Sequence, residues 1–381
     1  MKVNRVHVRC LWLLAASILV VASGNGCAAY PPGAFTSSKP GPVVSATAIP
    51  EPTNRQTTVY YGTDRGATGS PDPYKAFNAI RADLTLGSCV VAIPWDHEAG
   101  VLETHPWWRV WQRRDDPSKE VTLLSVTPMS REQFAEQLRN RVAGSQRRSV
   151  LIFIHGYNVT FSDAVRRTAQ LAFDLDFDGA PIAYSWPSNG ELLSYESDAA
   201  NADWTGRHLH EFLSLIAAQS GAADASLIVH SMGNRALAAA LNDLAQNPTI
   251  GEMKLQEIVL AAPDLDRATF EDQIAPAFAR IESRVTLYAS SHDEALGASE
   301  RIAGYPRVGD TAGGILIAPG IESVDASLAA HSILGHSYFG DSTSVLRDIH
   351  EVIAHAKPEE RSWLTATLTP HKDTYWQFAP K

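Results

Sequence analysis

The sequence "SLIVHSMGNRAL", residues 226–237, sets Ser231 between a stretch that favours a strand and a stretch that favours a helix. Aliphatic and β-branched residues precede the serine, and good helix formers follow Met232 and Gly233. A chain that turns this sharply from strand to helix projects the serine oxygen above the sheet edge, beside a helix N-terminus, and strains its backbone. A serine with a purely structural role gains nothing from that strain. We therefore take Ser231 as the candidate nucleophile.

The segments on both sides of this corner alternate between apolar strands and amphipathic helices. Strands are predicted at residues 149–158, 181–188, 226–229, 257–266 and 284–293, and helices at 162–175 (with Ser162 as N-cap), 203–218, 233–246, 267–281 and 342–356. Because a crossover helix follows each apolar strand, this pattern predicts an α/β fold with a mostly parallel sheet and helices on both faces. Residues 58–148 predict an N-terminal β-rich extension. Active sites of such sheets lie at the carboxyl ends of the strands.

Chemically useful side chains recur at these predicted strand ends. They are His155, Tyr157, Trp186, His230, Ser231, Asp264 and Asp293, with His336 in the loop before the last helix. A serine, an aspartate and a histidine in this chain order match the order of the catalytic triad in α/β hydrolases. The strand ends therefore predict a hydrolase that uses a serine nucleophile.

Five motifs give the chain a family resemblance: "YGTDR", "FIHGYN", "HSMGN", "APDLD" and "HSYF". On these motifs, residues 59–356 resemble the α/β-hydrolase superfamily of the serine carboxylesterase and lipase type. They resemble in particular a bacterial branch described only as an alpha/beta hydrolase of unknown function. One departure stands out, because Val229 occupies a position where the superfamily's Gly-x-Ser-x-Gly corner usually has glycine. The branched side chain is expected to shift the corner locally.

The triad needs a neutral imidazole that takes the serine proton and a buried carboxylate that holds the ring in the right tautomer. His336 resembles the superfamily's histidine in its position, and His331 is the nearby alternative. Asp293 resembles the usual acid in its position. Asp264, which ends the preceding strand, is the alternative acid, and it could instead cap the following helix, a role that Asp266 could share.

The expected oxyanion hole consists of two backbone N–H groups, those of Tyr157 and Met232. The side chains of Tyr157 and Trp186 are expected to line the substrate pocket, although Trp186 could belong to the core instead. His155 and His230 are expected to support the two turns through hydrogen bonds. No long apolar insertion resembles a lipase lid, so short- to medium-chain carboxylic esters are the expected small-molecule substrates.

Two other functions stay open on the sequence alone. The same triad could transfer an acyl group to an alcohol or cleave peptide bonds, and an inactive hydrolase fold could serve as a binding module. No cofactor and no metal are expected, because His208 and His210 lie two positions apart on a predicted helix and point to different faces.

The N-terminus has the pattern of an export signal. Residues 1–27 combine basic residues with an apolar run too short to span a bilayer, and Cys27 could carry the lipid of a lipoprotein. Residues 28–57 are expected to form a disordered linker, residues 58–356 the hydrolase domain and residues 357–381 a tail. The expected location is periplasmic or secreted, with a possible membrane anchor.

Charge and cysteine content exclude other classes. The formal net charge is −10, which opposes nucleic-acid binding. The aromatic and basic stretch "PWWRVWQRR", residues 106–114, is expected to be a strand with packed tryptophans and solvated arginines. Three cysteines, Cys10, Cys27 and Cys89, form neither a disulfide framework nor a zinc pattern.

Overall fold

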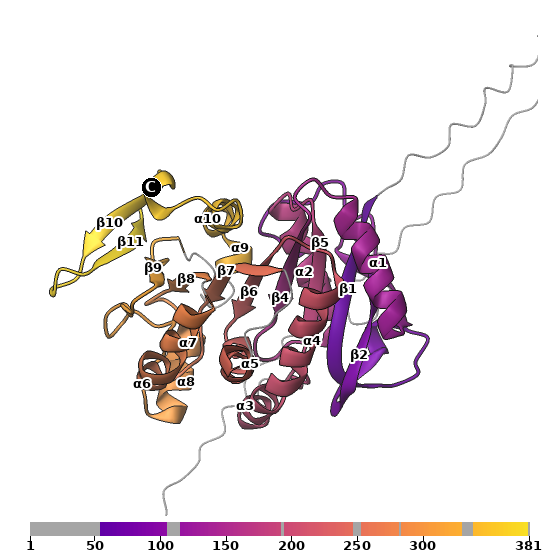
Figure 1. The fold of residues 1–381 in the computed structure, drawn as a ribbon, viewed down its shortest axis with the longest axis horizontal. Helices are drawn as coiled ribbons and strands as arrows, with labels where there is room; N and C mark the ends of the chain where they lie inside the picture. The colour runs from indigo at the N-terminus through magenta and orange to yellow at the C-terminus, as the bar shows by residue number, and fades with distance from the viewer. Residues whose placement is uncertain are drawn as a thin grey trace, which may run out of the picture. The chain divides into compact units, whose positions relative to one another are not determined.

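The structure of the protein is a computed structural model that describes residues 54–104, 115–191, 194–246, 253–281, 283–329 and 338–379. Within these residues the chain forms one sheet with the strand order β10-β11-β9-β8-β7-β6-β4-β5-β1-β2-β3 (Figure 1). The strands are β1 (Asn54–Ala67), β2 (Phe77–Pro94), β3 (Thr122–Met129), β4 (Ser149–Ile154), β5 (Ala180–Ser185), β6 (Asp224–His230), β7 (Lys254–Ala261), β8 (Arg284–Ala289), β9 (Ile321–Asp325), β10 (Leu364–Leu368) and β11 (Thr374–Phe378).

The central strands run parallel, as the sequence predicts. Every neighbouring pair from β9 through β8, β7, β6, β4 and β5 to β1 is parallel, and β2 and β3 extend the sheet as antiparallel strands. Strands β4, β5 and β6 are buried on both faces, except that β6 begins with a partly exposed residue. This burial explains why their sequences are nearly continuous apolar runs.

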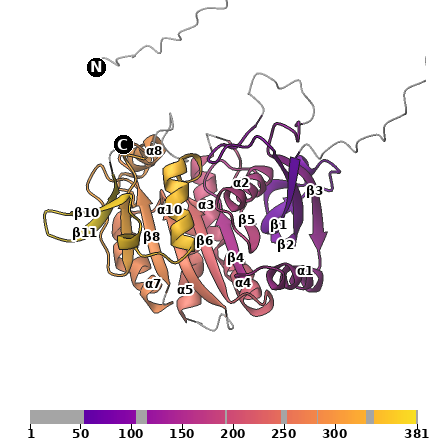
Figure 2. The same cartoon turned by 90° about the horizontal axis from the view of Figure 1, so that it is seen from above.

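Helices cover both faces of the sheet (Figure 2). The helices are α1 (Arg131–Ala143), α2 (Phe161–Asp174), α3 (Tyr195–Trp204), α4 (Gly206–Gln219), α5 (Gly233–Gln246), α6 (Arg267–Thr269), α7 (Ala275–Arg280), α8 (Glu294–Ala303), α9 (Tyr338–Asp341) and α10 (Thr343–Ile353). Apolar residues of α1, α4, α5 and α7 share one core cluster with strand residues such as Ile152, and residues of α2 and α10 share another with Leu151. Successive side chains of β4 therefore pack into the cores on opposite faces of the sheet.

The start of α2 differs from the prediction by two residues. Thr160, not Ser162, is the N-cap, because its side chain accepts the N–H of Asp163 while the Asp163 carboxylate accepts the N–H of Thr160. This reciprocal pair satisfies two donors that a helix start otherwise leaves without partners. The Ser162 hydroxyl instead lies 3.0 Å from the Thr160 hydroxyl.

The sheet extends beyond both predicted boundaries of the domain. Strand β1 begins at Asn54, so residues 54–57 belong to the sheet and not to a disordered linker. The predicted tail contains the hairpin of β10 and β11, and β11 pairs in parallel with β9. Backbone pairing with an existing strand orders these ends, and the sequence patterns there were too short to predict it. The predicted export signal, Cys27 and residues 106–114 lie outside the described residues.

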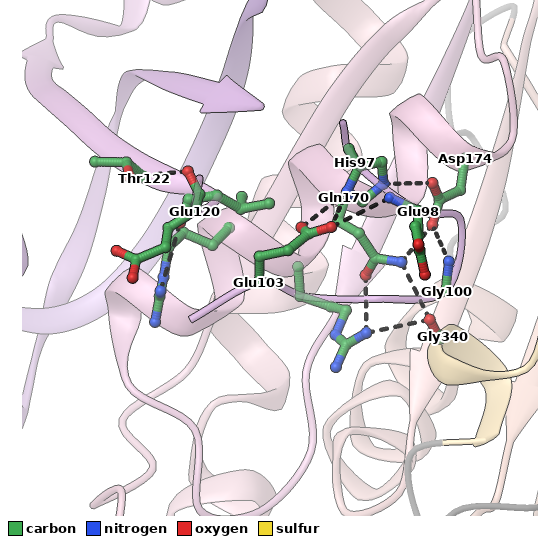
Figure 3. A network of polar contacts seen from close by, with 12 residues as sticks. His97, Glu98, Gly100, Glu103, Glu120, Thr122, Gln170, Asp174 and Gly340 are labelled. Carbon is green, nitrogen blue, oxygen red and sulfur yellow. Dashed lines mark hydrogen bonds and ion pairs between the residues drawn. The ribbon is translucent and has the colours of Figure 1, made fainter. Parts of the chain in front are cut away.

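A polar network fastens the segment after β2 to helices α2 and α9 (Figure 3). The buried ring of His97 lies 2.9 Å from a Glu103 oxygen through Nδ1 and 2.8 Å from Asp174 Oδ1 through Nε2. The other Asp174 oxygen accepts the amide of Gln170, and Gln170 also donates to the carbonyl of Gly340 in α9 at 3.1 Å. Three segments distant in sequence therefore meet in this network, two of them at His97 and the third through Gln170.

Candidate active site

Ser231 lies at the corner between β6 and α5 with a φ of 49°. L-residues rarely adopt this left-handed region, so the surrounding structure must fix it. The Ser231 N–H donates to the carbonyl of Ala261 at 2.9 Å, and the Ser231 carbonyl accepts the N–H of Asn234 at 3.0 Å. The side-chain amide of Asn234 donates to the same carbonyl at 2.9 Å. The strained strand-to-helix corner predicted from the sequence is therefore present.

Two glycines let the turn after β4 pack against this corner. A Cβ atom on Gly156 would lie 2.8 Å from the Cβ atom of Ser231, and one on Gly233 would lie 2.4 Å from the carbonyl oxygen of His155. Because contacts this short do not occur between real Cβ atoms and their neighbours, both positions require glycine for close approach.

Val229 fits the corner although glycine is usual at its position. Its side chain is fully buried in the same core cluster as that of Met232. The Val229 carbonyl accepts the side-chain amide of Asn234 at 3.2 Å, so the corner keeps its hydrogen bonds. The core cluster accommodates the branched side chain, which the sequence pattern could not reveal.

The two residues with the predicted oxyanion donors, Tyr157 and Met232, lie at the ends of adjacent parallel strands. Ile154 of β4 pairs with Val229 of β6, so both turns leave the same edge of the sheet. The Tyr157 side chain is half-buried, and its hydroxyl donates to the carbonyl of Glu191 at 3.1 Å. The common edge brings the two backbone segments together at the corner.

The predicted pocket residue Trp186 belongs to the core, the alternative left open by the sequence. Its side chain has 0% exposure, and its indole N–H donates to the carbonyl of His155 at 2.7 Å. The rings of Trp186 and His155 stack with centroids 5.0 Å apart. Trp186 therefore stabilises the turn after β4 from within the core.

His155 has the supporting role predicted for it. Its Nδ1 donates to the carbonyl of Gly156 at 2.8 Å, which leaves Nε2 as the acceptor, 3.2 Å from the Ser185 hydroxyl. Burial, and then the charge of Arg65, lowers the pKa of His155 to about 3. The ring is therefore neutral at all ordinary pH values and holds one fixed tautomer.

The two candidate acids have different partners. Asp293 is buried and caps α8, because its Oδ1 accepts the N–H of Leu296 at 3.0 Å. The Asp264 carboxylate accepts the hydroxyls of Ser299 at 2.6 Å and Tyr195 at 2.7 Å, and it lies 3.3 Å from Arg307 Nε. The helix after Asp264 is capped by Asp266 instead, which accepts the N–H of Thr269.

The candidate bases His336 and His331 lie outside the described residues. The segment that follows them is described, and it returns to the corner. Phe339 of α9 packs against His230, the residue before Ser231, with ring centroids 4.3 Å apart. The chain just after the predicted base is therefore anchored one residue from the predicted nucleophile.

Arg65, the last residue of "YGTDR", contacts the site, although the sequence analysis assigned it no role. Arg65 is 2% exposed, and its guanidinium donates to the Ser185 hydroxyl at 2.9 Å, the Ser188 carbonyl at 2.8 Å and the Val159 carbonyl at 2.7 Å. The neighbouring Asp64 accepts hydrogen bonds from the hydroxyls of Tyr184 in β5 and of Thr205, the N-cap of α4. The sequence signal that could have identified Arg65 is the charged pair Asp64–Arg65, which follows the apolar residues of β1.

A cavity of about 1060 Å³ lies along α8 and reaches Asp293. Its described lining is polar or small, and includes His292, Arg301 and Asp310. In the described part of the chain, no group of three or more His, Cys, Asp or Glu side chains is arranged to hold a metal ion. No helix among the same residues is long and apolar enough to cross a membrane.

The parallel sheet, the helices on both faces and the strained serine corner define an α/β-hydrolase fold. A family model described as "Alpha/beta hydrolase of unknown function (DUF900)" matches residues 130–355, more than half of the chain, and the chain belongs to this family. Among solved structures, dienelactone hydrolase from Anabaena variabilis is similar, with 12% identity and a TM-score of 0.35 over 80% of this chain and 98% of that chain. No curated protein matches the chain.

Proposed function

We propose that this protein is a serine hydrolase that cleaves carboxylic esters through an acyl-enzyme. The observation that carries the proposal is the left-handed backbone of Ser231, held at the end of a buried parallel strand and at the start of a helix. Such a corner is costly to form and presents one hydroxyl beside backbone N–H groups.

In the proposed reaction, the Ser231 oxygen attacks the ester carbonyl carbon while His336 takes the hydroxyl proton. The N–H groups of Tyr157 and Met232 stabilise the resulting oxyanion. The intermediate collapses, the C–O bond to the alcohol breaks, and the imidazolium protonates the leaving alkoxide. Water, activated by the same imidazole, then cleaves the acyl-enzyme, releasing the acid and restoring the Ser231 hydroxyl.

The position of Phe339 supports His336 as the base. His336 precedes Phe339 by three residues, so their Cα atoms are at most about 11 Å apart. Because the Phe339 ring packs on His230, a base three residues before Phe339 could reach the neighbouring Ser231.

The hydrogen bonds of Asp264 and the chain position of Asp293 favour Asp293 as the triad acid. Both oxygens of Asp264 already bind side chains from α3 and α8, and Arg307 lies beside them, which suits a structural role. Asp293 is buried and follows the next parallel strand, β8, in the position expected for the acid from the family resemblance.

The cavity along α8, which Asp293 lines and whose described lining does not include Ser231, favours a short- to medium-chain and polar ester substrate. Its volume of about 1060 Å³ lies just above the usual range of small-molecule sites, about 300–1,000 Å³. Charged residues such as Arg301 and Asp310 in its lining are poor partners for a long alkyl chain. We also propose export from the cytoplasm, on the N-terminal sequence pattern alone.

A fluorophosphonate probe tests the proposed nucleophile directly. The wild-type protein should be labelled at Ser231 and should hydrolyse p-nitrophenyl acetate, whereas Ser231→Ala should be unlabelled and lose about 10⁶-fold in kcat. Ser290→Ala, which changes a buried serine at the end of β8, is the matched control and should keep the label. Labelling that persists in Ser231→Ala would refute the assignment, and a wild-type protein without label or turnover would favour a binding module.

A graded series of p-nitrophenyl esters from acetate to palmitate tests the substrate class. Turnover should be highest for the shorter acyl chains. An added alcohol acceptor distinguishes a hydrolase from an acyltransferase, because transfer yields a new ester at the expense of free acid.

A further inference from the structure

Arg65 is a buried cation whose three closest acceptors are uncharged. The guanidinium donates to the Ser185 hydroxyl and to the carbonyls of Ser188 and Val159, at 2.7–2.9 Å. Burial lowers the pKa of Arg65 to about 10, so the group keeps its charge at neutral pH, and the carboxylates of Asp64 and Asp198 oppose this shift. Burying a charge in this way is costly unless its hydrogen bonds are made.

These bonds join one strand to the two loops that surround the proposed oxyanion hole. Arg65 belongs to β1, which is held beside β5 by the pairing of Thr63 with Ser185. The Val159 carbonyl lies in the turn after β4, two residues after Tyr157, and the Val159 N–H donates to the Ser188 hydroxyl at 3.2 Å. The planar guanidinium therefore fixes the turn after β4 relative to the loop after β5.

The turn after β4 needs such a restraint. Asn158, between Tyr157 and Val159, has a φ of 58°, so the turn includes a left-handed residue. An oxyanion donor works only within about 2.7–3.1 Å of the developing charge, so a small rotation of this turn removes most of its effect. The nearby His155 ring also faces the Arg65 guanidinium, at 3.5 Å.

We propose that Arg65 is a positioning residue of the oxyanion hole. Through the Val159 carbonyl and the Ser185 hydroxyl, its guanidinium holds the Tyr157 N–H where the substrate's carbonyl oxygen gains negative charge. This inference rests on the proposed ester hydrolysis at Ser231.

Arg65→Lys tests the inference, because a lysine keeps the charge but cannot hold three acceptors in one plane. Per active site titrated with a fluorophosphonate, kcat for p-nitrophenyl acetate should fall about 10- to 100-fold, less than the cost of deleting a donor outright. KM should change little. Affinity for a trifluoromethyl ketone, which mimics the tetrahedral intermediate, should fall by the same factor as kcat/KM.

Arg361→Lys is the matched control. Arg361 is also buried, but it binds Asp348 and Glu322 near the C-terminal hairpin. This variant should lower stability and leave kcat per active site unchanged. Ser185→Ala, a milder change, should lower kcat and ketone affinity in the same sense, which keeps the test decisive if Arg65→Lys fails to fold.

Hydrogen–deuterium exchange of residues 155–160 separates this inference from the proposed function. Exchange there should rise in Arg65→Lys and not in Arg361→Lys. An active wild-type enzyme whose kcat, ketone affinity and exchange are all unaffected by Arg65→Lys overturns the inference. If exchange is faster in Arg65→Lys but the wild-type protein shows neither labelling nor turnover, the restraint on the turn is real and the proposed function is wrong. Arg65 then has no role in catalysis.

Discussion

Ser231 and Arg65 each occupy a state that an isolated residue avoids. Ser231 has a left-handed backbone, and Arg65 holds a charge in the protein interior. In both cases backbone groups of neighbouring strands and turns provide the compensating hydrogen bonds. Strain and buried charge of this kind concentrate at functional sites, and here both occur at one edge of the sheet.

Substitution of each candidate acid by asparagine distinguishes the roles of Asp293 and Asp264. Asp293→Asn should reduce kcat about 10⁴-fold, because an amide favours the wrong imidazole tautomer. Asp264→Asn should mainly lower stability, because it weakens the contact with Arg307 beside Tyr195 and Ser299. Kinetics on p-nitrophenyl acetate and denaturant unfolding of both variants measure the difference. If Asp264→Asn proves the crippling change, Asp264 is the triad acid.

At the scale of elements, the segment after β2 is attached to α2 and α9 through a buried histidine. The ring of His97 lies between Glu103 and Asp174, and Asp174 also accepts the N–H of Gly100 at 2.9 Å (Figure 3). Burial disfavours the charged ring, but the hydrogen bonds and charges of Asp174 and Glu103 together outweigh it and raise the pKa of His97.

This raised pKa predicts a pH-dependent stability. The stabilisation from protonated His97 is complete below its unfolded pKa of about 6.5 and is lost as pH rises through the higher folded pKa. The difference in unfolding free energy between the wild type and His97→Gln should therefore shrink as pH rises above about 6.5. Urea unfolding at several pH values measures this difference, and His371→Gln, on the exposed turn before β11, is the control. A difference that does not vary with pH would contradict the predicted protonation.

At the scale of the described domain, the C-terminal hairpin is fastened by a buried ionic cluster. Asp348 of α10 accepts hydrogen bonds from Tyr288 at 2.6 Å, Trp363 at 2.6 Å and Arg361 at 3.0 Å. Arg361 also pairs with Glu322 of β9. Burial raises the pKa of Asp348 to about 6, so its charge depends on these partners.

Removing the cation of this cluster should be strongly destabilising. Arg361→Met leaves the buried Asp348 carboxylate without its cation and should cost about 3–5 kcal/mol in unfolding free energy. Arg347→Met, which removes an exposed guanidinium stacked over Trp363, should cost about 1 kcal/mol or less. Denaturant unfolding of the two variants compares them, and equal losses would show that the buried cluster adds no special stability.

The sequence by itself determined the parallel sheet, its covering helices and the serine corner, because apolar periodicity and local backbone preference are written in consecutive residues. Only the tertiary structure decided that Trp186 is core, that Val229 fits the corner, and that residues 364–378 join the sheet. It also brought Arg65 beside the turn of Tyr157, 90 and more positions along the chain. Such contacts depend on which strands become neighbours, and strand order is a property of the packed sheet that no local pattern encodes.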